Sequence, residues 1–280
     1  MAFREGLACL ARLAGWFVGN LSLNTLRMTG ERPGRKVLKR RRWYAAPVAV
    51  AGNVYAAMLG LNIRVLHNRA WLRREVTLYR RLYGERVVWK AGGWLEVPCL
   101  GDALSVFLGS PHQTGAAKLR ALATATRDLE RLHGIRVEEN GTFRRFSHGD
   151  ACVCNVTYCP ELDGAHWFDF ENVHTGKGGE EWRHADDFRA LLFTAAGCLP
   201  ESLVGQAFDA MLEAYADRAV LQALAERVAS GRLAFDTYHL GQVGMSPVLH
   251  KRLAGLLSER LEARLRHGPS AQAARSVNPI

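Results

Sequence analysis

The chain has 280 residues and carries 37 basic and 27 acidic side chains, for a formal net charge of +10. A hydrophobic content of 48% with only 9 prolines excludes disordered and low-complexity classes, and the length suffices for one large domain or two modest lobes. The positive charge lies in residues 1–90, which hold 18 basic and 4 acidic side chains and so suit nucleic acid, an anionic membrane or a phosphate-rich ligand.

Residues 1–26 are expected to form an amphipathic helix. Apolar residues recur between positions 7 and 18 at helical spacing, and Arg4, Glu5 and Arg12 interrupt the apolar stretch. The segment lacks a convincing small-residue cleavage pattern of a signal peptide. Two interpretations remain open, a helix packed on the domain or a helix lying on a membrane surface.

The segment Trp43–Ile63 contains no charged residue and follows four consecutive basic residues. Its 21 positions would just span a bilayer. Six alanines, together with Pro47 and several glycines and asparagines, make its hydrophobicity weak. A buried or half-buried helix is therefore expected rather than a membrane span.

The rest of the first hundred residues mixes strand and helix patterns. Residues 35–39 follow a turn-rich stretch and predict a strand that leaves a hairpin. Residues 70–82 predict a helix with Leu72, Val76, Tyr79 and Leu82 on one face. The runs 87–89 and 94–97 flank a Gly-Gly pair and predict a second hairpin, and the apolar run 104–108 leads to an expected interlobe connector at 109–111.

From residue 114 onward the pattern is helical. A long helix is predicted at 116–133, where Gly134 provides a stop, and further helices at 185–197, 201–216, 217–230 and 247–266. The chain is therefore expected to be α+β, with a small mixed lobe followed by a larger, mainly helical lobe. Residues 268–280 are polar and are expected to form a flexible tail.

The stretch between these helices carries the clearest chemical pattern. His148-Gly149-Asp150 is followed five residues later by Asn155, and Asp169-Phe170-Glu171 comes at the end of an apolar run. An aspartate can orient a hydroxyl and accept its proton, while an asparagine and a second aspartate supply the hard oxygen ligands that magnesium prefers. This order and spacing suit phosphoryl transfer.

These motifs resemble those of the protein-kinase-like phosphotransferases, in particular the branch of aminoglycoside and choline kinases and bacterial lipopolysaccharide-core kinases. In that branch the catalytic loop reads HGD-x4-N and the metal motif often ends DFE. The preceding Leu129–His133 is similar to the helix end that leads into the loop. The resemblance implies a bilobal kinase-like fold, ATP and Mg²⁺, with an N-lobe over 27–110, including a helical insertion, and a C-lobe over 111–267.

The same resemblance implies roles for single residues. Asp150 would be the catalytic base, with Asn155 and Asp169 as magnesium ligands and His148 as a supporting loop residue. Asp187 would brace the catalytic loop, in preference to Asp186, although simple capping of the following helix would also explain either aspartate.

A lysine of the small lobe should contact the ATP phosphates and be held by a helix glutamate. Lys39 at the end of a predicted strand and Glu75 in the helix 70–82 fit this pattern, and an inserted helix would account for their long separation. A competing alignment places Arg64 at the lysine position. Lys39 is favoured because arginine is not an equivalent compact point charge.

The kinase-like machinery leaves the phosphate acceptor open. One hypothesis is a sugar hydroxyl of a lipopolysaccharide core or similar glycolipid, with a cytoplasmic protein held peripherally at the inner membrane face, because residues 1–42 hold ten basic and two acidic side chains. A second is a soluble small molecule or a protein Ser/Thr. A third is a pseudokinase or adaptor, since only the isolated glycines Gly30 and Gly34 stand where a glycine-rich phosphate loop is expected. Nucleic acid is not expected, because interleaved aromatic and basic residues are missing.

Overall fold

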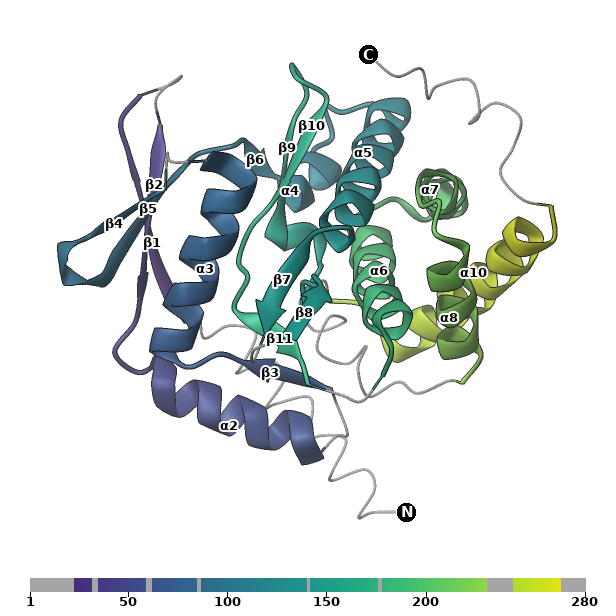
Figure 1. The fold of residues 1–280 in the computed structure, drawn as a ribbon. Coiled ribbons are helices and arrows are strands. Elements are labelled where there is room, and N and C mark those ends of the chain that lie inside the picture. Colours follow the sequence, from purple (N-terminus) through teal and green to yellow (C-terminus); the bar gives the residue numbers. More distant parts are fainter. Residues whose placement is uncertain are drawn as a thin grey trace. The chain divides into compact units, whose positions relative to one another are not determined.

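A computed structural model describes residues 23–31, 35–58, 62–84, 87–139, 142–175, 178–230 and 244–267. The chain is α+β, as predicted, and divides into two compact units (Figure 1). The first unit comprises Met1–Gly101 and Phe168–Gly176, and the second comprises Asp102–Trp167 and Lys177–Ile280. The short segment 168–176, which begins one residue before Asp169, thus belongs with the N-terminal part of the chain.

A four-stranded antiparallel sheet is the centre of the first unit. Its order is β1 (Asn24–Thr29), β2 (Lys36–Arg41), β5 (Trp94–Pro98) and β4 (Val88–Lys90). The register pairs Thr29 with Lys36, so β1 and β2 form the expected hairpin, although positions 32–34 between them lie outside the described residues. Gly92 and Gly93, both at φ 75°, make the turn between β4 and β5, where the Gly-Gly pair predicted one.

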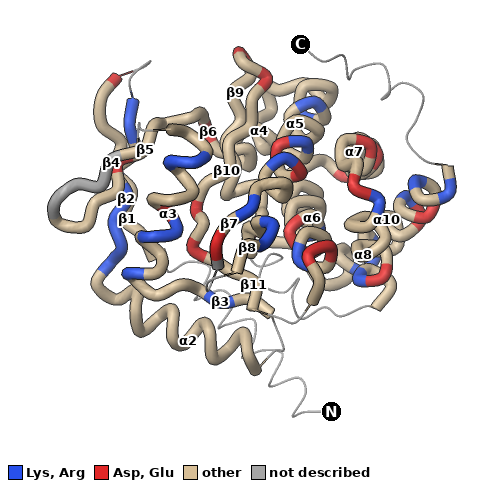
Figure 2. Tube along the Cα trace, viewed as in Figure 1, with Lys and Arg blue, Asp and Glu red and all other residues tan. Residues whose placement is uncertain are grey.

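Helix α3 (Asn68–Tyr83) belongs to the first unit and carries several of its basic residues (Figure 2). Its existence was predicted, but of the four residues predicted to share one face only Tyr79 is fully buried. The buried side chains are Trp71, Glu75, Leu78 and Tyr79, whereas Leu72, Val76 and Leu82 are only half-buried. Apolar periodicity could not include Glu75, whose carboxylate is buried because it meets a buried cation.

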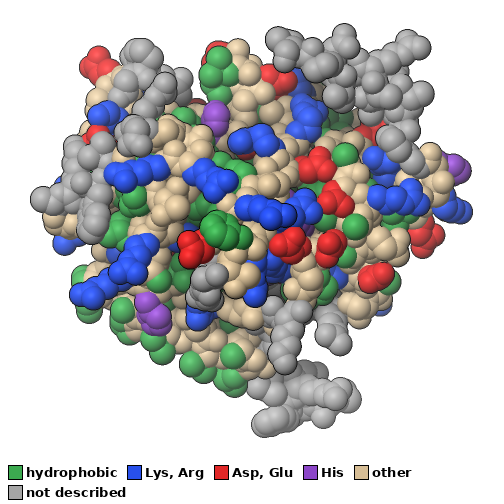
Figure 3. All heavy atoms as spheres, viewed as in Figure 1, with side chains coloured by type: hydrophobic (Ala, Val, Ile, Leu, Met, Phe, Trp, Pro, Cys, Tyr) green, Lys and Arg blue, Asp and Glu red, His purple; other side chains and the backbone are tan. Residues whose placement is uncertain are grey.

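Helix α2 (Ala45–Met58) is shorter than the expected insertion over 43–63, because the chain enters strand β3 (Ile63–Val65) at the end of that range. Strand β3 pairs with β11 (Asn172–His174). Within α2 only Ala45 and Ala49 are fully buried. Hydrophobic side chains gather over this helix along the lower edge of the molecule in Figure 3.

The second unit is mainly helical. It contains a three-stranded sheet of order β10 (Gly164–Trp167), β9 (Val156–Cys159) and β6 (Asp102–Ala103), and the hairpin β7 (Arg136–Glu139) and β8 (Thr142–Arg145). The helices are α4 (Leu104–Gly109), α5 (Gly115–His133), α6 (Glu180–Gly197), α7 (Glu201–Ala214), α8 (Arg218–Ala229) and α10 (Pro247–His267). Helix α6 is buried over nearly its whole length from Arg183 onward, so it forms the centre of this unit.

Several expected boundaries differ from those observed. The predicted helix over 1–26 lies outside the described residues up to position 22, and its last residues were wrongly assigned, since Asn24–Leu26 lie in β1. The compact units divide at Gly101, whereas the sequence placed the boundary at 110/111, because the apolar run 104–108 is a helix of the second unit. The expected tail 268–280 also lies outside the described residues. Among the helices that the structure describes, none is long and apolar enough to cross a membrane.

Candidate active site

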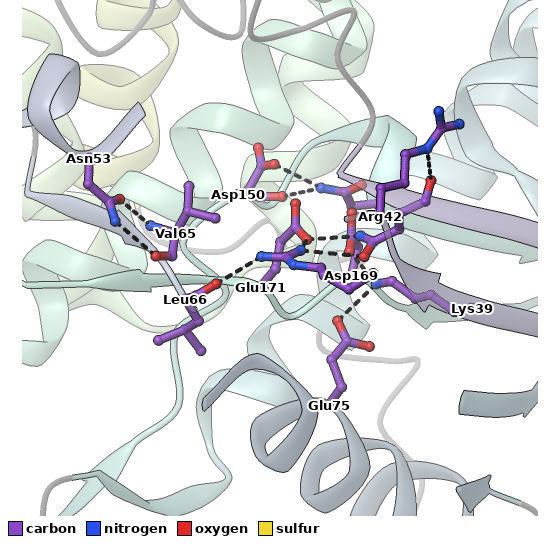
Figure 4. A network of polar contacts seen from close by, with 12 residues as sticks. Lys39, Arg42, Asn53, Val65, Leu66, Glu75, Asp150, Asp169 and Glu171 are labelled. Carbon is purple, nitrogen blue, oxygen red and sulfur yellow. Dashed lines mark hydrogen bonds and ion pairs between the residues drawn. The ribbon is translucent and has the colours of Figure 1, made fainter. Parts of the chain in front are cut away.

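Lys39 lies in β2, paired with Leu26 on one side and Leu95 on the other. Its side chain is almost fully buried, and Nζ lies 3.0 Å from Oε1 of Glu75 on α3 (Figure 4). The same ammonium group forms an ion pair with Oδ1 of Asp169. One buried cation is therefore held between a helix carboxylate and the aspartate of the Asp-Phe-Glu motif.

The electrostatics of this triad keep the lysine charged. Burial alone would lower the pKa of Lys39, but the carboxylates of Asp169, Glu75 and Glu171 together raise it above its ordinary value. Burial raises the pKa of Glu75, and the ammonium group of Lys39 opposes that shift. A charged lysine at this position is suited to binding an anion such as a phosphate.

The backbone of Asp169 is held in an unusual conformation. Its φ of 66° lies in the left-handed region, which only a few per cent of non-glycine residues adopt. Its N–H lies 3.3 Å from the hydroxyl of Tyr79, and the buried ring of the next residue, Phe170, meets the Tyr79 ring edge-on at 5.3 Å. The packing of Phe170 on α3 thus fixes where Asp169 places its carboxylate.

Arg41 and Glu171 form a second ion pair beside the first, which the sequence analysis missed. Glu171 Oε2 also accepts a hydrogen bond of 2.9 Å from Asn24 Nδ2, and Arg41 Nη2 donates to the carbonyl of Leu66 at 2.8 Å. Burial, reinforced by Asp169, raises the pKa of Glu171 to about 7 against the opposing charges of Lys39 and Arg41. The sequence could have pointed to Arg41, because residues two apart in a strand share a face and Arg41 is therefore on the same face of β2 as Lys39.

Arg64, the alternative to Lys39, lies elsewhere in the first unit. It is on β3, opposite Val173 of β11, and its side chain is exposed. In this structure Lys39, and not Arg64, contacts Glu75.

Asp150 and Asn155 lie together in the second unit, in the loop that ends in the short helix η3 (Val153–Asn155). Asn155 Nδ2 donates to the backbone carbonyl of Asp150 at 2.9 Å and to its Oδ2 at 3.1 Å (Figure 4). These contacts involve the amide nitrogen and fix the orientation of the side chain. The amide oxygen, Oδ1, receives no hydrogen bond from any residue that the structure describes. An oriented amide oxygen next to a carboxylate is suited to binding a hard cation.

Asp187 holds the backbone of this loop. Its Oδ2 accepts the N–H of His148 at 2.6 Å and its Oδ1 accepts the N–H of Gly149 at 2.8 Å. Gly149 has a φ of 80°, which favours glycine at this turn. Asp186 instead pairs with Arg227 and Arg189. The capping alternative is wrong for both aspartates, because α6 begins at Glu180 with Gly179 as its N-cap.

The buried side chain that contacts Asp187 from α5 was not predicted. His133, the last residue of α5, places Nε2 3.1 Å from Asp187 Oδ2 and Nδ1 2.6 Å from the hydroxyl of Tyr215. Because a carboxylate only accepts, Nε2 carries a proton and donates to Asp187. The ring of His184 stacks on that of His133 at 4.0 Å, and its Nε2 bonds the carbonyl of Phe146 at 2.8 Å.

His148 is fully buried, and its ring meets that of Trp167 edge-on at 5.4 Å. Its backbone N–H donates to Oδ2 of Asp187. The position is compatible with the structural role in the loop that was expected for it.

The residues expected to bind magnesium have the right donors. In the described part of the chain, no group of three or more His, Cys, Asp or Glu side chains could hold a metal by itself. Magnesium, however, keeps several waters and substrate oxygens and needs only one or two protein ligands. Asn155 Oδ1 meets that need, as does Asp169 Oδ2, which receives no hydrogen bond from any residue that the structure describes.

Comparison with known proteins adds no assignment. No family model matches the chain, and no curated protein matches it. The functional argument therefore depends on the motifs and on the geometry of the two clusters.

Proposed function

We propose that the protein is an ATP-dependent phosphotransferase with a bilobal, protein-kinase-like arrangement, which moves the γ-phosphate of ATP to an alcohol hydroxyl. The observation that carries this proposal is Lys39, a buried ammonium group held by Glu75 on a helix and by Asp169 of the Asp-Phe-Glu motif. A buried lysine with two buried or half-buried acidic partners is costly to maintain without a function.

The chain's residues divide the work of phosphoryl transfer. Lys39 would contact the phosphates of ATP, and Asp169 and Asn155 would bind magnesium. When bound, the metal neutralises the charge that develops on the phosphate oxygens. Asp150 would orient the acceptor hydroxyl and accept its proton as the new oxygen–phosphorus bond forms and the bond to ADP breaks. Asp187 acts on Asp150 indirectly, by fixing the backbone at His148 and Gly149.

For the acceptor we propose a sugar hydroxyl of a lipopolysaccharide core or a similar glycolipid, with the enzyme peripheral to the cytoplasmic face of an anionic membrane. The motif resemblance supports this choice, as does the excess of basic side chains in residues 1–42. A soluble small molecule and a protein Ser/Thr are the alternative acceptors.

A screen for phosphate transfer from Mg-ATP tests the proposal, with core oligosaccharide, glycolipid, small alcohols and a Ser/Thr peptide as acceptors. Asp150→Asn should reduce transfer by about 100-fold or more, because the substituted side chain cannot accept the hydroxyl proton. Asp102→Asn, an exposed change in the same unit, is the matched control and should keep wild-type turnover.

Equal turnover in wild-type protein and Asp150→Asn would refute the catalytic assignment. Absence of transfer to every acceptor, with ATP bound, would favour the pseudokinase or adaptor alternative.

A further inference from the structure

Helix α2 combines an unusual composition with an unusual environment. Figure 2 shows no charged residue along it, and it is apolar on nearly all sides. A helix of this kind normally lies in a protein core or in lipid. Yet one face of this helix is exposed, with the exposed fraction 90% for Trp43 at its start, 50% for Val50, 56% for Val54 and 78% for Met58.

The exposed residues within the helix form one row. The helical period places Val50, Val54 and Met58 in a single row, and the exposed Pro47 and Ala51 lie beside it. Scattered apolar side chains are normal on a protein surface, but a contiguous apolar helix face marks an interaction site. We call the row Val50, Val54 and Met58, together with Trp43, the α2 face.

We infer that the α2 face binds the surface of an anionic lipid bilayer. Charge complementarity selects this partner. Residues 32–74, which include α2, hold eleven basic side chains and not one acidic side chain. Some of these cations are used inside the protein, as Lys39 and Arg41 are. Among the described residues six are exposed, namely Lys36, which pairs with Glu96, and Arg40, Arg42, Arg64, Arg69 and Arg73. Each basic residue near an anionic membrane surface contributes about 1 kcal/mol of attraction.

The geometry of α2 suits a helix that lies on a membrane. Its 14 residues extend for roughly 21 Å, too short to span the hydrocarbon core. Trp43 stands at one end, and tryptophan prefers the boundary between headgroups and acyl chains. The Asn53 side chain bonds both the N–H and the carbonyl of Val65, at 2.7 and 3.0 Å, which attaches the helix to β3. The exposed row is therefore presented by a fixed helix.

This inference builds on the membrane partner of the proposed function, but it does not depend on phosphoryl transfer. Its test contains no nucleotide and no acceptor, so it can fail while the catalytic proposal stands, and the reverse also holds. Competing occupants of the α2 face are another segment of the same chain and a second copy of the protein.

The test is co-sedimentation of the full chain with vesicles of phosphatidylcholine containing about 30 mol% phosphatidylglycerol, compared with phosphatidylcholine alone. Wild-type protein should bind the anionic vesicles. Val54→Glu should weaken binding by about tenfold or more, because it puts a charge in the centre of the apolar row. Val106→Glu, at a position 66% exposed on α4, is the matched control and should bind as wild type.

Thermal unfolding and size-exclusion chromatography of the same variants distinguish membrane binding from coverage of the α2 face by another segment of the chain or by a second copy of the protein. The inference requires that Val54→Glu keep the wild-type elution volume and a Tm within about 2 °C, as expected for a solvent-exposed site. A large loss of Tm would show that the chain itself covers the face, and a change from dimer to monomer would assign it to a second copy. Either result overturns the inference, as would equal binding of Val54→Glu and wild type, equal binding to both vesicle types, or no binding to anionic vesicles.

Discussion

At the scale of single residues, the account depends on one buried cation. Lys39 is almost inaccessible to solvent, and its charge is balanced by Glu75 and Asp169. Taking a charge out of water costs several kcal/mol, which is recovered only through partners in close contact. The other carboxylate oxygen of Asp169 receives no hydrogen bond from the described residues, so under the proposed function this residue would hold the lysine and a metal at the same time.

Lys39→Met should abolish the stabilisation of the protein by Mg-ATP, because the phosphates lose their cationic partner. A ligand at 100 times its Kd stabilises a protein by about 2.7 kcal/mol, so loss of binding is easily seen as loss of the rise in Tm. Arg64→Met should keep the full rise, since Arg64 is exposed on β3.

Lys39→Met also leaves the carboxylate of Glu75 buried without its cation, so the double variant Lys39→Met/Glu75→Gln serves as the folding control. If only Arg64→Met removes the effect of Mg-ATP, Lys39 has been assigned wrongly.

Sequence reasoning pointed to single residues where the chain carries a short motif. Asp150 and Asn155 were suggested by their spacing and Asp187 by the family resemblance, and the structure places them in one hydrogen-bonded loop system in the second unit. Arg41 with Glu171, and His133 with Asp187, escaped notice because these partners lie 130 and 54 positions apart in the chain. No local pattern encodes such pairs, and only the fold brings them together.

At the scale of elements, hydrophobic periodicity predicted the existence of the long helices better than their inner faces. Helix α5 was predicted to within one residue at its start, and its end at His133 was correct because Gly134 follows. The buried face of α3 was misjudged since Glu75, a charged residue, belongs to it. The three-stranded sheet of the second unit was not predicted, because β6 has two residues and β9 and β10 have four each.

Helix α6 gives the protein a specific sensitivity to acid. Burial, assisted by the neighbouring His133, lowers the pKa of His184 to about 2, so the folded state keeps this ring neutral. The unfolded chain takes up a proton near pH 6.5, and acid therefore favours unfolding. The stabilisation is complete above pH 6.5 and is lost progressively as the pH falls from there towards 2.

We expect His184 to account for about 2 kcal/mol of the loss in unfolding free energy between pH 7 and pH 5. Urea unfolding at the two pH values measures this. His184→Gln, which can still donate to the carbonyl of Phe146, should show a loss smaller by that amount, and the exposed His112→Gln should behave as wild type. Identical losses in all three proteins would contradict the assignment.

At the scale of the whole molecule, charge is divided between the two halves of the chain. The basic first unit contains Lys39, and the second contains Asp150 and Asn155. The distribution of charge along the sequence predicted a basic part and a slightly acidic part. The inclusion of residues 168–176 in the first unit could not be predicted, because it depends on the pairing of β11 with β3. That inclusion places Asp169 in the unit of Lys39. The proposed function therefore requires residues of both units to bind one magnesium–nucleotide complex.

Calorimetric titration of ATP with and without Mg²⁺ tests this requirement most directly. The account predicts that Mg²⁺ tightens ATP binding by about tenfold or more. Asp169→Asn in the first unit and Asn155→Ala in the second should each remove most of that gain, because the proposed function assigns both residues to the same ion. Binding that is independent of Mg²⁺ in the wild-type protein, or a gain that survives either substitution unchanged, would contradict it.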